Sequence, residues 1–81
     1  MPDDPAAESK ARIRAAIIDH LQRYPLAGDT TDGMIACWMP VGRGDASRFV
    51  EDVVESMAAS GELVAQQLPD GRILYKRGPR I

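Results

Sequence analysis

The sequence predicts one small domain of the α+β class, in which three helices precede a two-stranded β-hairpin. Three stretches carry apolar residues at helical spacing, and Pro25 and Pro40 separate them. After the third stretch, two short apolar runs flank Leu-Pro-Asp-Gly at 68–71, which is typical of a hairpin turn. A chain of 81 residues is long enough for one domain of this kind.

The first helix is expected to end at Tyr24, and the sequence offers two places for its start. Asp4 followed by Pro5 fits a helix N-terminus, because proline at the first helical position lacks only an N–H that the helix leaves unpaired. Ser9 is a second candidate cap. The apolar stripe of this helix is Ile13, Ala16, Ile17 and Leu21. Pro25 then disfavours helical geometry at Tyr24.

The second helix is short and ends before Pro40. A very short strand at Leu26–Ala27 is expected ahead of it, in the break between the first two helices. The candidate N-caps of the second helix are Asp29, Thr30 and Thr31. Its apolar stripe is Met34, Ile35, Trp38 and Met39.

The third helix has the clearest apolar stripe in the chain. Asp45 is the expected N-cap, and Gly61 fits the left-handed position that closes many helices. The apolar positions between them are Phe49, Val50, Val53, Val54, Met57 and Ala58.

The hairpin register follows from the turn. A type I turn with Gly71 in the left-handed position places Leu68 opposite Arg72. The strands then pair Gln67 with Ile73, Ala65 with Tyr75 and Leu63 with Arg77. The expected core face carries Leu63, Ala65, Ile73 and Tyr75, and a slip of one residue would exchange the two faces.

The charges are segregated along the chain, although the net charge is only −2. Residues 10–23 hold four basic residues and one acidic residue, and residues 72–81 hold four basic residues and no acidic one. Residues 45–62, by contrast, hold five acidic residues and one arginine. The sequence therefore predicts a local basic face on a chain that is acidic overall.

The order helix, short helix, turn, helix, hairpin resembles the winged helix-turn-helix family. The most specific part is SGELVAQQLPDGRILY at residues 60–75, in which a helix ends in serine and glycine and an apolar pair starts a strand. A D-G turn then leads to a strand that ends in Leu-Tyr. The resemblance implies a three-helix fold with a C-terminal two-stranded hairpin, the wing. It places the winged helix domain at 9–77, between a flexible N-terminus, 1–8, and a C-terminal tail, 78–81.

In DNA-binding members of this family, the third helix enters the major groove and the wing contacts the backbone or the minor groove. The resemblance thus implies double-stranded DNA as a partner and a transcription-regulatory role, with contacts led by the basic wing. The nucleic-acid-binding residues that it implies are Arg43, Ser47, Arg48, Arg72, Lys76 and Arg77. Helix three departs from this expectation, because Glu51, Asp52 and Glu55 would lie beside a polyanion.

Two other interpretations of the same residues stay open. The chain is alternatively a protein-protein interaction module or a homodimeric adaptor that binds no nucleic acid. The basic hairpin would then serve solubility and keep the sheet edge from pairing with other chains.

Catalysis, metal binding and membrane insertion are not expected. His20 is the one histidine and Cys37 the one cysteine, too few soft ligands for a usual zinc site and no nucleophile-base set. We predict no catalytic residues, no metal and no cofactor, a half-buried structural His20, a packing role for Cys37 and a core position for Trp38. A single cysteine and the lack of a signal peptide favour a cytoplasmic setting.

Overall fold

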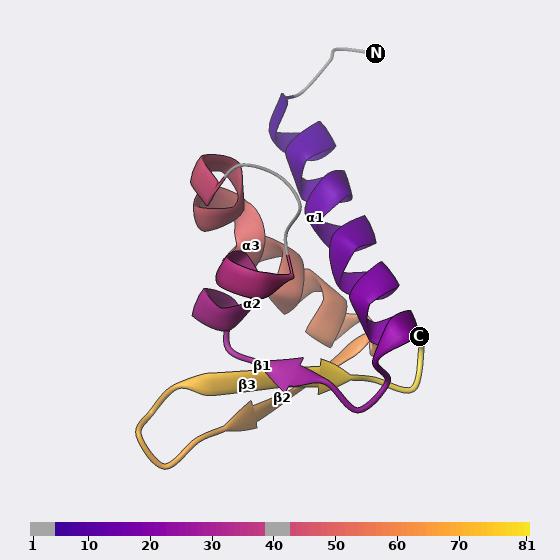
Figure 1. Cartoon of the computed structure of the whole chain (residues 1–81), viewed down its shortest axis with the longest axis vertical. Coiled ribbons are helices and arrows are strands. Elements are labelled where there is room, and N and C mark those ends of the chain that lie inside the picture. The colour runs from indigo at the N-terminus through magenta and orange to yellow at the C-terminus, as the bar shows by residue number, and fades with distance from the viewer. Residues whose placement is uncertain (1–4, 39–42) are drawn as a thin grey trace.

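The computed structural model describes the backbone of residues 5–38 and 43–81 and the side chains of residues 7–38 and 48–81. Over this part of the chain the fold is α+β, as predicted, with three helices and a three-stranded antiparallel sheet in the strand order β1-β3-β2. The elements in chain order are α1 (Pro5–Arg23), β1 (Gly28–Asp29), α2 (Thr31–Cys37), α3 (Arg43–Ala59), β2 (Leu63–Gln67) and β3 (Ile73–Arg77). The helices lie on one side of the sheet, and the β2–β3 hairpin extends past them (Figure 1).

One apolar core joins the helices to the sheet. The predicted stripes supply most of it: Ile13, Ile17, Leu21, Met34, Trp38, Val50, Val53, Val54 and Met57 are all buried, together with Leu63 and Tyr75 of the sheet. Helix α3 packs against α1, α2 and β2. Each valine in this helix costs up to about 0.7 kcal/mol of helix propensity relative to alanine. Burying a valine side chain, however, stabilises the fold by about 1.5–3 kcal/mol. Tertiary packing therefore decides that this segment is helical.

Helix α1 begins at Pro5, inside the segment 1–8 that the sequence analysis assigned to the N-terminus. Asp4, the cap proposed for that start, lies outside the described residues. At the other end, the Tyr24 amide donates to the His20 carbonyl at 2.8 Å, and Pro25 follows in a turn. The Ala27 amide closes this turn on the Tyr24 carbonyl at 2.9 Å.

The short strand β1 lies two residues later than predicted, because Pro25 and Leu26 belong to the turn. Gly28 pairs with Lys76 and Asp29 with Tyr75, so β1 adds a third strand beside β3. Of the three candidate caps of α2, Thr30 is the cap, and its hydroxyl oxygen accepts from the Gly33 amide at 3.3 Å. Helix α2 ends at Cys37; Met39 and Pro40 lie outside the described residues.

The prediction that Asp45 caps α3 is wrong, because the helix begins at Arg43 and Asp45 lies within its first turn. An acidic residue in a first turn still complements the positive end of the helix dipole. The predicted C-terminus is confirmed: Gly61 has φ +86°, and the Glu62 amide donates back to the Met57 carbonyl at 2.9 Å. This pattern satisfies carbonyls that the last turn of the helix leaves free.

The predicted hairpin register is confirmed at every pair. Gly71 has φ +92°, and the Leu68 amide donates to the Arg72 carbonyl at 2.7 Å. The predicted core face is right at Leu63 and Tyr75, which are buried. Ile73 is exposed, because the outer half of the hairpin extends past the helices (Figure 1). Ala65 is exposed although it pairs with buried Tyr75, because it lies on the edge strand β2 and Tyr75 on the central strand.

Residues 78–81, which we assigned to a tail, return to the domain. Gly78 is buried, and its amide donates to the Glu62 carbonyl at 2.8 Å. The Arg80 amide donates to the Gly61 carbonyl at 3.1 Å, and Ile81 packs against the core. Among the described helices, none is long and apolar enough to cross a membrane.

Candidate functional site

The cations predicted to lead DNA binding lie on the hairpin but point to different places. Arg72 precedes β3 and Arg77 ends it, so about 16 Å of extended strand separates them. Lys76 and Arg77 are consecutive in β3 and therefore project from opposite faces of the sheet. The structure does not gather Arg72, Lys76 and Arg77 into one cluster.

Two of these three side chains already have partners. The guanidinium of Arg72 donates to Asp70 Oδ2 at 2.7 Å, and the Arg72 amide donates to Asp70 Oδ1 at 3.0 Å. The amide and then the guanidinium of Arg72 lower the pKa of the Asp70 carboxyl. Arg77 donates from Nη2 to the Ile81 carbonyl at 2.7 Å. Lys76 is exposed and makes no ion pair within the described chain.

The other three predicted site residues, Arg43, Ser47 and Arg48, all lie near the N-terminus of α3. Arg43 and Ser47 belong to the first turns of α3, and their side chains are outside the described part of the structure. The exposed Arg48 guanidinium carbon lies 5.4 Å from the centre of the Phe49 ring. Arg48 is therefore the one predicted α3 residue whose side chain is described.

The basic stretch of α1 is largely matched by acidic partners. Arg12 pairs with Glu8 at 2.7 Å, Arg23 with Asp19 at 3.4 Å, and Arg14 with Glu62 at the end of the α3–β2 connection. These exposed pairs contribute little to stability, but they reduce the positive potential that the sequence suggested for this helix.

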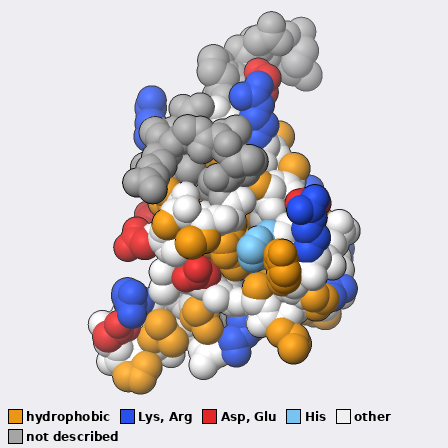
Figure 2. All heavy atoms as spheres, in the orientation of Figure 1, with side chains coloured by type: hydrophobic (Ala, Val, Ile, Leu, Met, Phe, Trp, Pro, Cys, Tyr) orange, Lys and Arg blue, Asp and Glu red, His pale blue; other side chains and the backbone are white. Residues whose placement is uncertain are grey.

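A groove of about 310 Å³ lies where the start of α2, the middle of α3 and the outer half of the hairpin meet. We call it the acidic groove, and the lining residues that matter here are Asp32, Glu51, Glu55, Arg72, Ile73 and Tyr75. Glu51 and Glu55 are four residues apart and share one face of α3. Figure 2 shows acidic side chains between the helices and the hairpin on the face in view. Three carboxylates thus face one guanidinium, and Asp70 already pairs with that guanidinium.

Tyr75 extends from the central strand into the lining of this groove. Only 7% of the residue is exposed, and its hydroxyl has no hydrogen-bond partner among the described residues, where every fully buried side-chain polar atom is paired; the hydroxyl is therefore the part of Tyr75 that reaches solvent. Burial, then the negative charges of Glu55 and Glu51, raise the pKa of the Tyr75 phenol. The hydroxyl therefore stays protonated at neutral pH and is available to a ligand as both donor and acceptor.

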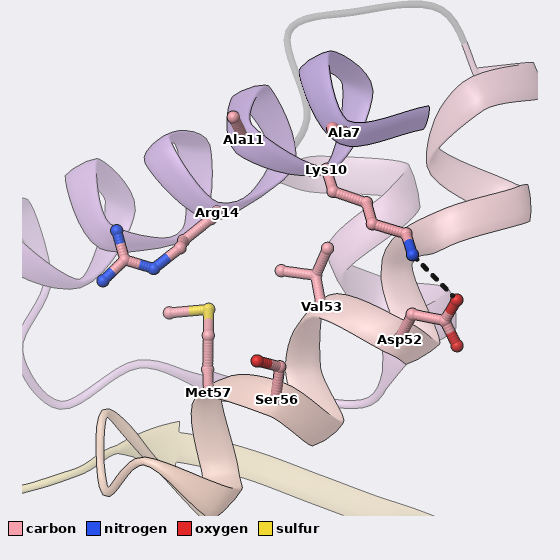
Figure 3. Close-up of a pocket in the computed structure, with 8 residues that line it drawn as sticks. All are labelled: Ala7, Lys10, Ala11, Arg14, Asp52, Val53, Ser56 and Met57. Atoms are coloured by element: carbon pink, nitrogen blue, oxygen red, sulfur yellow. Dashed lines mark ion pairs between the residues drawn. The ribbon is translucent and has the colours of Figure 1, made fainter. Parts of the chain in front are cut away.

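A second cavity, of about 400 Å³, lies between α1 and α3 (Figure 3). Its floor is apolar, with Val53 and Met57 pointing into it, and Lys10 Nζ reaches Asp52 Oδ2 at 3.4 Å along one side. Lys10 and Asp52 pair with each other, Arg14 pairs with Glu62 outside the lining, and no set of acid, base and nucleophile converges among these described residues. This cavity is a less specific candidate than the acidic groove.

An aromatic stack joins the ends of α1 and α2. His20 is half-buried, as predicted, and its ring stacks on Trp38 with 4.1 Å between centres and 18° between planes. Trp38 is 8% exposed and belongs to the core, which confirms the prediction. The packing role predicted for Cys37 is wrong, because Cys37 precedes Trp38 on the helix and faces solvent.

Sequence reasoning missed the acidic groove, although it noted the acidic face of the third helix. Asp32 joins Glu51 and Glu55 only through the packing of α2 on α3, and Tyr75 reaches them from the sheet. The one signal that pointed there was the acidic side of α3 beside a hairpin. No family model, curated protein or solved structure matches this chain.

Proposed function

We propose that the chain is a winged helix-turn-helix domain that works as a protein-interaction module. The fold assignment is supported by the element order α1-β1-α2-α3-β2-β3 and by the sheet order β1-β3-β2. In this assignment α2 and α3 form the helix-turn-helix, and the β2–β3 hairpin is the wing. The short β1 then completes the sheet beside the central strand.

The acidic groove is the observation that carries the functional proposal. In DNA-binding winged helices, the third helix and the wing face the duplex. Here the surface between α3 and the wing presents Asp32, Glu51 and Glu55. DNA affinity arises mainly from cations that replace counterions at phosphates, so carboxylates at this position oppose it. A partner that carries positive charge suits the same surface.

DNA binding led by the wing, with a transcription-regulatory role, is the second candidate. Lys76, Arg80 and Arg48 have no acidic partner within the described chain, and they remain able to meet phosphates. Arg43 and Ser47, near the start of α3, would assist on this hypothesis.

Titration of a fluorescent DNA duplex at several salt concentrations separates the two functions. The protein-interaction proposal predicts only weak binding, whose salt dependence is little changed when Arg72, Lys76 and Arg77 are all replaced by alanine. DNA binding led by the wing predicts saturable binding, with a log–log salt slope that falls by up to about three in the triple variant. That second result would replace the protein-interaction proposal.

A further inference from the structure

We infer that the acidic groove binds a cationic side chain, an arginine, presented by a protein partner. This inference rests on the proposed function and names the chemistry of the partner. The groove lies against α2, α3 and the hairpin, so the site is built by three elements rather than by one acidic helix.

The charges of the groove are the first argument. Glu51 and Glu55 project from one face of α3, and Asp32 adds a carboxylate from α2. None of these three carboxylates forms an ion pair within the described chain. Arg72 is the one basic residue in the lining, and its guanidinium is held by Asp70 at 2.7 Å. The groove is therefore short of positive charge.

Tyr75 is the second, independent argument. Its side chain is more than nine-tenths buried and lines the groove, and its hydroxyl has no partner among the described residues. Among the described residues no fully buried side-chain polar atom lacks a partner, so this unpaired hydroxyl reaches the solvent in the groove and is open to a ligand. A guanidinium N–H can donate to this hydroxyl oxygen while its other N–H groups reach the carboxylates.

The shape of the groove favours arginine over a small cation. A volume of about 310 Å³ accommodates a whole side chain. The planar guanidinium has five donors and can serve several acceptors at once, whereas an ammonium group acts as a compact point charge. The Ile73 side chain, 43% exposed at the edge of the lining, offers an apolar contact to the methylene stem.

The experiment is a titration of the isotope-labelled 81-residue chain with a capped tetra-arginine peptide, followed by backbone amide NMR. Its counterpart, in which citrulline replaces each arginine, keeps the shape and removes the charge. We expect saturable shifts of the amides of Asp32, Glu55, Gly71 and Tyr75 with the arginine peptide, and none with the citrulline peptide.

Paired variants locate the binding. The double substitution Glu51→Gln and Glu55→Gln should lower the affinity for the arginine peptide at least about tenfold. Glu8→Gln with Asp19→Asn changes the net charge equally but on α1, and should change the affinity less than about twofold. Tyr75→Phe removes only the hydroxyl and should weaken binding about two- to tenfold. Because that hydroxyl has no partner in the described structure, the melting temperature of Tyr75→Phe should stay unchanged.

Arg72→Ala gives opposite results on the two hypotheses. It removes a neighbouring cation, so the groove should bind the arginine peptide as tightly as before or more tightly. If the same surface contacts DNA, Arg72→Ala should instead weaken duplex binding.

The possible failures are distinguishable. Equal binding of the citrulline peptide, or arginine-peptide shifts confined to other surfaces, would overturn the arginine site and leave the protein-interaction proposal standing. Duplex DNA that shifts the groove amides, and loses affinity in Arg72→Ala, would overturn both.

Discussion

Gly78 is the position at which one methyl group should most clearly disturb the return of residues 78–81 to the domain. The glycine is buried, and a Cβ atom there would lie 2.8 Å from the Glu62 carbonyl carbon and 3.0 Å from its oxygen. It would also overlap the Gly61 carbonyl oxygen. All of these atoms belong to the backbone, so no side-chain rotation relieves the overlap.

The size of the effect follows from the hydrogen bonds that must give way. Moving residue 78 outward breaks the bond from its amide to the Glu62 carbonyl and the bond from the Arg80 amide to the Gly61 carbonyl. At about 1 kcal/mol each, Gly78→Ala should lower the free energy of unfolding by about 2 kcal/mol. In a domain of this size, that corresponds to a melting temperature lower by about 8–16 °C.

Urea unfolding followed by tryptophan fluorescence tests this prediction, because Trp38 is the only tryptophan and is buried. Gly28→Ala is the matched control: the nearest atom to its Cβ is Lys76 Cγ at 3.0 Å, in a flexible side chain that can move. The control should cost less than about 1 kcal/mol. If Gly78→Ala is no less stable than Gly28→Ala, residues 78–81 do not support the domain as described.

Three further perturbations test other parts of the fold. Val53→Asp places a charge at a core position of α3 that is 5% exposed, so circular dichroism should show a largely unfolded domain; a cooperative melt like the native one would contradict the assigned core face. Thr30→Ala removes the α2 cap and should cost about 0.5–1 kcal/mol in urea unfolding, at the low end for caps because the bond is long; no loss would mean that the cap is not formed. The pKa of Tyr75 is raised in the folded state, so its contribution to stability is complete below about pH 10 and is lost as the pH rises through the folded pKa. In the Tyr24→Phe variant, phenolate absorbance should show that Tyr75 ionises at a higher pH in the folded than in the urea-unfolded protein. Identical titration curves for the two states would contradict its burial.

Local chemistry made the hairpin predictable. Gly71 needs a left-handed backbone and the turn length fixes the pairing, so the register followed from four residues alone. Gly61 likewise marked the end of α3. The burial of the two strand faces was less predictable, because the exposure of Ile73 depends on how far the helices reach along the hairpin and that of Ala65 on its place in an edge strand.

The acidic groove depends on long-range packing, which a single sequence does not encode in any short pattern. Asp32 was one of several polar residues at a helix start, and only the contact of α2 with α3 brings it near Glu55. The basic residues of the hairpin illustrate the converse. Two consecutive basic residues in the sequence suggest one basic patch. Because successive side chains of a strand point to opposite faces of the sheet, Lys76 and Arg77 lie on different faces.

The strand order β1-β3-β2 also constrains how this chain acquires its structure. Both outer strands are synthesised before the middle strand to which they pair; Gly28, for example, has no pairing partner until Lys76 has been synthesised. Each outer strand can therefore pair only after β3 has been synthesised. The β1–β3 pairing joins residues separated by most of the chain, and such non-local pairings slow folding. A nascent chain that stops before residue 73 would contain its helical segments but lack the central strand β3, to which β1 and β2 pair. The sheet is therefore the last part of the domain that can form.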